Sequence, residues 1–297
     1  MGEARPEGRV RELEGIAQRG RWLVISGVAH AGAGHVGGPL SAMDLLVALY
    51  FHTMRVDPRD PHLTDRDRFI LSKGHSAMGL YAVLAMRGYF PEEELATFDQ
   101  ADSRLQGHPD MRLLPGIDMS TGSLGQGLSV GVGMALAARR RDQSRTTWVL
   151  LGDGELQEGM VWEAVHTAAR YELGNLVAIV DQNGLQQFGW DPTEVDRGDR
   201  RDPWAGADLG QVFAGFGWRV LTVDGHDMRA VVEVYDEALA GPTDQPTVVL
   251  ARTTKGKGVS FAENTFHWHT GLATEDELRL AAQELGIEMP VEEGATR

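Results

Sequence analysis

Residues 146–184, TTWVLLGDGELQEGMVWEAVHTAARYELGNLVAIVDQNG, decide the fold class. Residues 146–154 and residues 174–184 each contain an apolar run of the length expected for a strand buried on both faces. Between them, residues 158–173 place apolar side chains at helical spacing. Strand, amphipathic helix and strand in this order predict a β-α-β unit, in which the two strands run parallel.

The same alternation continues toward the carboxyl terminus. WRVLTVDG (218–225) and PTVVLART (246–253) read as further strands, with an amphipathic helix predicted between them at residues 228–241. This order predicts an α/β fold, a parallel sheet with helices on both faces. Toward the amino terminus we expect helices at residues 10–29 and 128–141, and an amphipathic helix from Ser41 to Met54.

Composition narrows the classes of function. The chain of 297 residues has 43 acidic against 28 basic side chains, a net charge of -15, which disfavours binding to nucleic acids and to anionic membranes. It contains no cysteine, which excludes disulfides, thiolate metal sites and a cysteine nucleophile and agrees with a reducing compartment. Because we find neither an apolar signal core nor a membrane-spanning run, we expect a cytoplasmic protein.

A glycine pattern at Gly32-Ala33-Gly34-His35-Val36-Gly37 has the spacing of a dinucleotide-binding turn. That turn requires a strand before it and an acidic residue at the end of the next strand. The preceding residues 10–29 have helical spacing instead, and Asp57, at about the right distance, stands in a polar loop with prolines. We therefore reject a dinucleotide site and expect the glycines to serve a different ligand or to bring His35 into a tight turn.

Polar residues follow two successive strands of the predicted sheet. Asp153 comes directly after one strand and Asn183 after the next, so both should lie at the same edge, where parallel sheets bind ligands. Carboxylate and amide oxygens suit Mg²⁺ when a diphosphate supplies the remaining oxygens. Gly152-Asp153-Gly154 alone would indicate only a turn. Together with Asn183 it favours a metal-diphosphate site.

Gly152-Asp153-Gly154 followed some thirty residues later by Asn183 resembles the thiamin diphosphate signature. The surrounding segments resemble motifs of the transketolase amino-terminal domain, in the family's order, and the resemblance covers roughly residues 10–270. The matching segments are GHVGGPL (34–40), RFILSKGHS (68–76), GHP (107–109), STGSLGQGLS (120–129) and LGDGELQEG (151–159).

The resemblance implies the thiamin diphosphate-binding fold of the diphosphate-binding (PP) type. Residues 1–297 would form a single such domain, with a surface excursion at about residues 190–210. It also implies that Asp153, Asn183 and the Leu185 carbonyl bind Mg²⁺, for which Ca²⁺ is a possible substitute. Gly154 and His75 would lie near the diphosphate.

Further site residues follow from the same resemblance. Gly122 and Leu124 would contact the aminopyrimidine of the cofactor, and Glu158 would lie at a subunit interface close to the activating glutamate of a partner. His35, His108 and His269 would face the substrate, where histidines suit proton transfer near neutral pH. The segment FHWHTG contains both His267 and His269, and the Trp-His pair of the family favours His269.

The expected function is that of the amino-terminal subunit of a two-chain transketolase, which transfers a two-carbon ketol unit from a ketose to an aldehyde. A carboxyl-terminal subunit with a pyrimidine-binding and a third domain would supply the missing glutamate, in an α2β2 assembly. Two alternatives remain open. One is a pyruvate-using thiamin-dependent decarboxylase or acyl transferase component, and the other is a cofactor-binding subunit without turnover.

Overall fold

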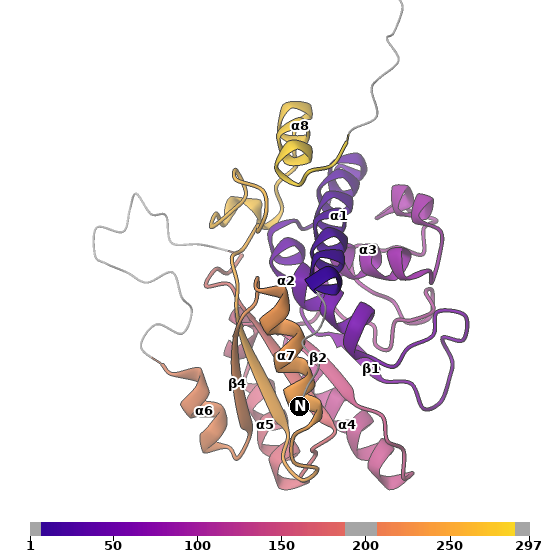
Figure 1. Cartoon of the computed structure of the whole chain (residues 1–297). Coiled ribbons are helices and arrows are strands. Elements are labelled where there is room, and N and C mark those ends of the chain that lie inside the picture. Colours follow the sequence, from indigo (N-terminus) through magenta and orange to yellow (C-terminus); the bar gives the residue numbers. More distant parts are fainter. Residues whose placement is uncertain (1–6, 188–206, 289–297) are drawn as a thin grey trace, which may run out of the picture.

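Five parallel strands form the sheet in the part of the chain that the computed structural model describes, residues 7–187 and 207–288 (Figure 1). Their order across the sheet is β1-β2-β3-β5-β4. The strands are β1 (Arg68–Leu71), β2 (Thr147–Gly152), β3 (Leu176–Gln182), β4 (Arg219–Asp224) and β5 (Thr247–Arg252). The predicted parallel sheet is thereby confirmed.

Helices follow or precede each strand. The α-helices are α1 (Glu7–Ala31), α2 (Gly37–Ala48), α3 (Ala77–Arg87), α4 (Gly127–Arg140), α5 (Gly159–Arg170), α6 (Leu209–Gly215), α7 (Met228–Leu239) and α8 (Glu275–Glu284). A π-helical turn, Leu49–Thr53, extends α2, and short 3-10 turns occupy Gly74–Ser76, Glu92–Thr97, Gly154–Gln157 and His267–His269.

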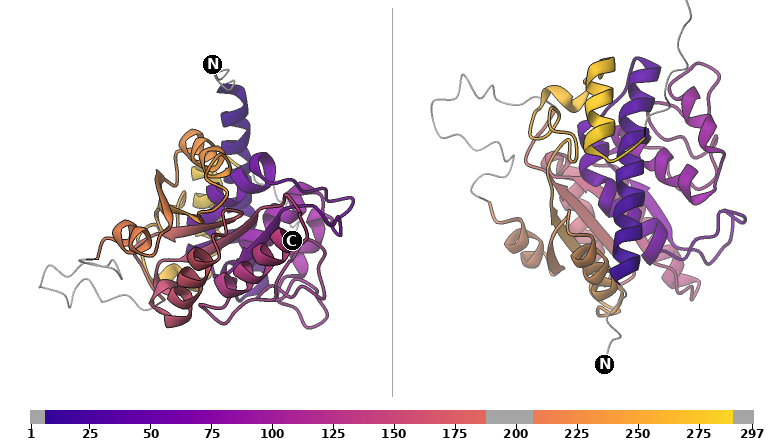
Figure 2. Two further views of the ribbon diagram at one scale, coloured as in Figure 1. Left: turned by 90° about the horizontal axis from the view of Figure 1, so that it is seen from below. Right: turned by 45° about the horizontal axis from the view of Figure 1, so that its top comes forward.

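Two apolar cores cover the two faces of the sheet. Along β2, Trp148 and Leu150 belong to the core shared with α1, α2, α3 and α7, whereas Val149 and Leu151 belong to the core shared with α4, α5 and α6. This alternation follows from the period of two in a strand. Figure 2 shows helices on both sides of the sheet, as the sequence predicts.

The segment before His35 is helical, which confirms that no strand leads into the glycine pattern at residues 32–37. The prediction of an amphipathic helix from Ser41 to Met54 is wrong in two respects. The helix α2 begins at Gly37, and every residue of it is buried. It packs against α1, α3 and α7, and a helix enclosed on all sides needs no polar stripe.

Strand β1 is absent from the strands predicted from the sequence. Its four residues are too few to show a period, and pairing with β2 from Arg68 to Leu71 makes them a strand. Helix α6 was also unpredicted, and it begins within the expected surface excursion at about residues 190–210. The remainder of that excursion, through residue 206, lies outside the described residues.

The long irregular segment of residues 102–126 is anchored to the sheet by Asp118. This buried carboxylate accepts hydrogen bonds from the guanidinium of Arg66 at 2.9 and 2.6 Å, from Arg68 at 3.0 Å and from the Phe69 amide at 2.9 Å. The ion pairs fix the segment at the start of β1. This anchor therefore holds His108 and the following glycines of the segment in a fixed position relative to the sheet.

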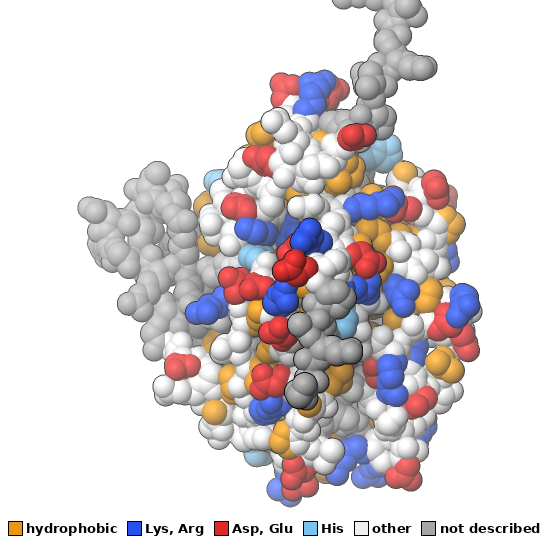
Figure 3. Space-filling view, viewed as in Figure 1, with side chains coloured by type: hydrophobic (Ala, Val, Ile, Leu, Met, Phe, Trp, Pro, Cys, Tyr) orange, Lys and Arg blue, Asp and Glu red, His pale blue; other side chains and the backbone are white. Residues whose placement is uncertain are grey.

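The surface mixes charges of both signs. On the face shown in Figure 3, acidic and basic side chains are interspersed without a broad area of one sign. Among the described residues, no helix has the length and apolar character needed to cross a bilayer.

Candidate functional site

All eleven site residues predicted from the sequence line one cavity of about 400 Å³ at the carboxyl edge of the sheet. The lining comes from the segment before α2, the turn after β1, the irregular segment before α4, the ends of β2 and β3, and the segments after β5. The eleven are His35, His75, His108, Gly122, Leu124, Asp153, Gly154, Glu158, Asn183, Leu185 and His269. The sheet topology explains their convergence, because parallel strands all end at this edge.

Asp153 and Asn183 lie at the ends of adjacent strands. The two Asp153 carboxylate oxygens accept hydrogen bonds from the amides of Gly154 at 2.8 Å and Gly184 at 2.6 Å. The Asn183 Oδ1 accepts from the Leu185 amide at 3.1 Å. Burial raises the pKa of Asp153 to about 7 in spite of these bonds.

Four histidine rings gather over this edge. The His35 ring centroid lies 5.3 Å from that of His75, 5.9 Å from His108 and 5.0 Å from His269, and the rings of His75 and His269 are 5.1 Å apart. The neighbouring His267 packs instead against Phe266, with ring centroids 4.0 Å apart. Of the two histidines in FHWHTG, the structure therefore brings His269 into the cavity.

Three of these four histidines have depressed pKa values and are neutral at pH 7. Burial, with the charges of His108 and Lys255, lowers the pKa of His35 to about 4. Burial and the nearby Lys255 ammonium lower the pKa of His269 to about 3. Burial, followed by the charge of Lys73, likewise depresses the pKa of His75 well below its ordinary value. Neutral imidazoles both donate and accept hydrogen bonds, so the cluster can exchange protons with a bound hydroxyl.

The glycine-rich segment before α4 approaches its neighbours too closely for side chains. Gly122 has φ +148° and faces the His108 ring, and a Cβ on Gly125 would come within 2.7 Å of the Glu158 Cβ. Both positions also require positive φ, which favours glycine. Glycines at these two positions therefore let the backbone pack directly against His108 and Glu158, which line the cavity.

Glu158 stands at the mouth of this cavity. It is exposed and lies directly before α5, for which its side chain forms no cap. Leu124, also exposed, flanks the same mouth.

The model of the transketolase thiamine diphosphate-binding domain matches residues 13–293. The chain belongs to the transketolase family.

Transketolase relatives of similar length share much of the sequence. One of the subunits of the apulose-4-phosphate transketolase of Phocaeicola vulgatus is 40% identical over 277 residues, 93% of this chain and 95% of that protein. A 6-deoxy-6-sulfo-D-fructose transketolase subunit from Clostridium sp. is 40% identical over 265 residues, 89% of this chain and 93% of that protein. The sequence-based resemblance to subunits of split transketolases is confirmed.

Solved transketolase structures share the fold. A transketolase of Pichia stipitis superposes with a TM-score of 0.83 and 34% sequence identity, covering 93% of this chain. The match spans 41% of the length of that transketolase. The transketolase of Campylobacter jejuni gives a TM-score of 0.83 at 29% identity, over 93% of this chain and 43% of that one.

Several residues around the transketolase-like cavity escaped the sequence analysis. Lys73 and Lys255 line it, and both are almost fully buried. The Lys255 Nζ lies 3.0 Å from the Gln186 carbonyl and 3.0 Å from the His269 Nδ1. Burial, followed by the charge of Lys73, lowers the pKa of Lys255 to about 8. Because Lys73 is paired with Asp181, the Lys255 ammonium is the charge that makes the floor of the cavity attractive to an anion.

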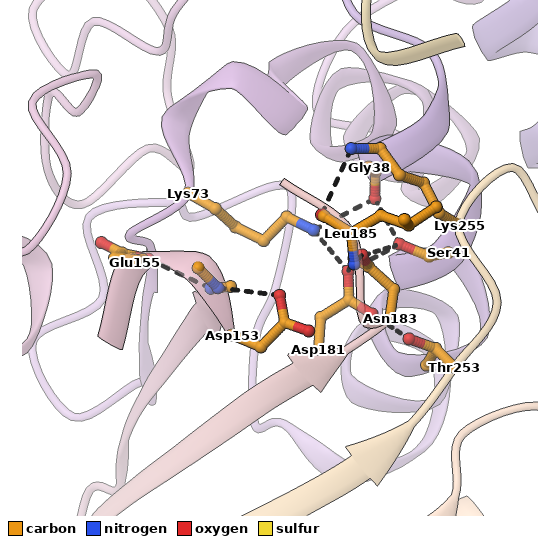
Figure 4. A network of polar contacts seen from close by, with 12 residues as sticks. Gly38, Ser41, Lys73, Asp153, Glu155, Asp181, Asn183, Leu185, Thr253 and Lys255 are labelled. Carbon is orange, nitrogen blue, oxygen red and sulfur yellow. Dashed lines mark hydrogen bonds and ion pairs between the residues drawn. The ribbon is translucent and has the colours of Figure 1, made fainter. Parts of the chain in front are cut away.

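Asp181, fully buried near the end of β3, organises this floor (Figure 4). It accepts hydrogen bonds from Ser41 at 2.6 Å, from the Asn183 amide at 3.1 Å and from Thr253, and it forms an ion pair with Lys73. A charged residue directly after the apolar run of residues 176–180, still within the strand, was the available sequence signal. It marks a buried charge that must be paired.

Glu155 holds the other side of the cavity. It accepts hydrogen bonds from the Ser72 hydroxyl, the Gly125 amide at 2.8 Å and the Gly152 amide at 3.1 Å. The carboxylate thus ties the end of β2 to the glycine-rich segment and the turn after β1. Nothing in its sequence position distinguished it from an exposed residue of a turn.

The donor set at the strand ends fits a hard divalent cation. It consists of a carboxylate, an amide oxygen and a backbone carbonyl, which are ligands that Mg²⁺ and Ca²⁺ prefer. Within the described residues no three His, Asp or Glu side chains cluster as a metal site, so the other ligands would come from the diphosphate and from water. A cation here would also favour the ionised form of Asp153, which burial otherwise disfavours.

The depressed histidine pKa values predict an acid-sensitive fold. His269 stays neutral in the folded chain down to a pKa of about 3, whereas the unfolded chain takes up its proton near 6.5. The contribution of His269 to the free energy of unfolding is therefore fully present above pH 6.5, and it is lost progressively as the pH falls below that value. Between pH 7.5 and pH 5, wild type should lose about 1 kcal/mol more unfolding free energy than His269→Gln, after allowance for solvent screening. Urea unfolding at the two pH values measures this difference. Equal losses in both proteins would contradict the assignment, since the remaining groups titrate in both.

Proposed function

We propose that this chain is the cofactor-binding subunit of a two-component transketolase, which transfers a two-carbon ketol unit from a ketose phosphate to an aldehyde. The observation that carries the proposal is the convergence of Asp153 and Asn183 with four histidines in one cavity. The first group suits a metal diphosphate, and the second suits proton transfer to sugar hydroxyls. Transketolase relatives of the same length, named as subunits, support the two-component form.

The strand-end oxygens of Asp153, Asn183 and the Leu185 carbonyl would hold Mg²⁺, with Ca²⁺ as a substitute. Gly154 and His75 would adjoin the diphosphate. The buried Lys255 ammonium, which lines the same cavity, would supply positive charge for the diphosphate. Bound there, thiamin diphosphate supplies the electron sink for breaking a carbon-carbon bond.

The rest of the cavity would receive the aminopyrimidine and the substrate. Gly122 and Leu124 would contact the aminopyrimidine ring, and exposed Glu158 would meet the glutamate of the partner. His35, His108 and His269 would bind the sugar hydroxyls and move protons on and off them. The neutral ring of His35 can donate through one nitrogen and accept through the other, whereas His269 accepts from the Lys255 ammonium through Nδ1 and is left to donate through Nε2.

The partner proposed is a carboxyl-terminal subunit with a pyrimidine-binding and a third domain, in an α2β2 assembly. This chain would act as one PP-type domain over residues 1–297. His35, His75 and His269 are neutral at pH 7 because their pKa values are depressed, and they offer no positive charge to the substrate phosphate, so we assign recognition of that phosphate to the partner. We propose the cytoplasm as the compartment, supported by a sequence without cysteine.

A donor comparison tests the proposed function. The complex with its partner, loaded with Mg²⁺ and thiamin diphosphate, is offered either xylulose 5-phosphate or pyruvate together with an aldehyde. We expect ketol transfer from the ketose phosphate, loss of the activity on chelation of Mg²⁺, and no turnover by either polypeptide without the other. Release of carbon dioxide from pyruvate as the main reaction, or turnover of neither donor, would replace this proposal with one of its two alternatives.

His35→Ala is expected to lower turnover far more than it lowers cofactor affinity. His35 contacts the other three rings of the cluster, and loss of a proton-transferring group costs about 100-fold or more. Steady-state kinetics should show this drop, while the thiamin diphosphate dissociation constant changes less than about threefold. Equal losses in both quantities would make His35 a structural residue.

A further inference from the structure

His226 lies outside the cavity, in the turn between β4 and α7, and both of its ring nitrogens are engaged. Its Nδ1 lies 2.8 Å from Asp44 Oδ2, and its Nε2 lies 2.8 Å from the backbone nitrogen of Thr254. The side chain is 14% exposed. The ring therefore links α2 to the segment that follows β5.

The Thr254 contact fixes the tautomer of this ring. A backbone N–H only donates, so Nε2 must be the unprotonated acceptor and Nδ1 must carry the proton. Nδ1 then donates to the Asp44 carboxylate. Only this tautomer, with its proton on the nitrogen facing Asp44, satisfies both neighbours at once.

Asp44 is held as an anion. Burial raises its pKa, but the charge of Arg21 and the hydrogen bond with His226 outweigh that effect, and the net shift is downward. Arg21 on α1 is itself buried and pairs with the same carboxylate oxygen. The ion pair thus orients Asp44, and Asp44 orients the imidazole.

Thr254 stands between Thr253, which bonds to Asp181, and Lys255, which lines the cavity. The Thr253 hydroxyl donates to Asp181, and the Lys255 ammonium reaches the Gln186 carbonyl and His269. Asp44 also lies one turn after Ser41 on α2, and Ser41 donates to Asp181 as well. One helix therefore supports the cavity floor twice, directly through Ser41 and indirectly through His226.

We propose that His226 is a positioning residue for the cofactor site, acting through the Thr254 amide to hold Lys255 in the cavity. Without the acceptor on His226, the backbone at residues 253–255 loses the hydrogen bond of the Thr254 amide and keeps those of Thr253 and Lys255. The Lys255 ammonium is then held less firmly in the cavity. The inference rests on the proposed function, because it assigns Lys255 to the anionic end of thiamin diphosphate. His226 itself does not contact the substrate or the cofactor.

Two substitutions separate the two bonds of the ring. His226→Gln offers an amide oxygen near the Nε2 position and keeps an acceptor for Thr254, but loses the donor to Asp44. His226→Asn keeps a donor near the Nδ1 position for Asp44, but loses the acceptor. Each variant loses one of the two hydrogen bonds, so their urea midpoints should shift by similar amounts. His62→Asn, at an exposed loop position, is the control.

Binding of thiamin diphosphate with Mg²⁺ is measured by calorimetry in the complex with the partner. We expect His226→Asn to raise the dissociation constant about tenfold, and His226→Gln and His62→Asn to raise it less than about threefold. If His226→Asn and His226→Gln weaken cofactor binding equally, or if neither weakens it, the inference about His226 is overturned while the proposed function stands. Failure of the wild-type complex to bind the cofactor would overturn the proposed function and this inference with it.

Hydrogen exchange of the Thr254 amide gives a readout without any cofactor. Measured by mass spectrometry on the cofactor-free complex, it should be slow in wild type and in His226→Gln and at least about tenfold faster in His226→Asn. Fast exchange in the wild type would show that the Thr254 bond does not hold the segment. That result would overturn the proposal even if a variant failed to fold.

Discussion

Asp153→Ala abolishes Mg²⁺-dependent binding of thiamin diphosphate in the assembled complex, if the strand-end site is assigned correctly. The substitution removes the one carboxylate among the three proposed metal ligands. Loss of a charged metal ligand should weaken cofactor affinity by at least about 100-fold, since outer-shell partners alone are worth about 10- to 100-fold. Calorimetric titration of the cofactor, with Mg²⁺ present and with Mg²⁺ chelated, measures the effect.

The fold should tolerate this change. The variant loses two hydrogen bonds from the Gly154 and Gly184 amides, but it also removes a carboxylate whose charged form is disfavoured by burial. We expect the two effects to offset each other to within about 1 kcal/mol of unfolding free energy. Asp102→Ala, at an exposed position, is the matched control. Unchanged cofactor affinity in a folded Asp153→Ala complex would refute the site assignment.

Asp181→Asn should lower the free energy of unfolding by about 3–5 kcal/mol, the largest stability effect that we expect from a single substitution here. The change preserves shape but removes the negative charge that balances Lys73. Because both side chains are almost fully buried, the Lys73 ammonium would remain in the interior without its counter-charge. Urea unfolding of the cofactor-free chain at pH 7 measures the loss.

A double variant distinguishes this explanation from simple loss of hydrogen bonds. Adding Lys73→Met to Asp181→Asn removes the unpaired ammonium and should restore about half of the lost stability or more. The surface variant Asp57→Asn, which breaks the exposed ion pair with Arg59, should leave the urea midpoint almost unchanged. A loss for Asp181→Asn as small as that of Asp57→Asn would mean that the buried pair does not support the site.

The sequence predicted those parts of the fold and site that depend on order along the chain. Asp153 and Asn183 each follow a strand, and the rule for parallel sheets brings strand ends together, so their proximity was predictable. The tight turns of the glycine-rich segment are likewise a local property. The motifs that resemble transketolase added the four histidines, which converge from segments far apart in the sequence.

The unpredicted parts depend on tertiary packing. The all-round burial of α2 follows from its place among α1, α3 and α7, and β1 becomes a strand by pairing with β2. Lys255 was missed for a related reason. Its ammonium reaches the cavity from a segment whose Thr254 amide bonds to His226, a residue 28 positions away, and a flexible side chain has no sequence signature for where it ends.

The measurement that tests the central claim most directly is mass spectrometry of this protein isolated natively from the cells that make it. A cofactor-binding subunit of a two-component transketolase should be recovered with a companion in equal amount. That companion should contain a pyrimidine-binding domain with the glutamate that activates the cofactor. Recovery of the chain alone, or only as copies of itself, would contradict the two-component account and make a binding role without turnover the better explanation.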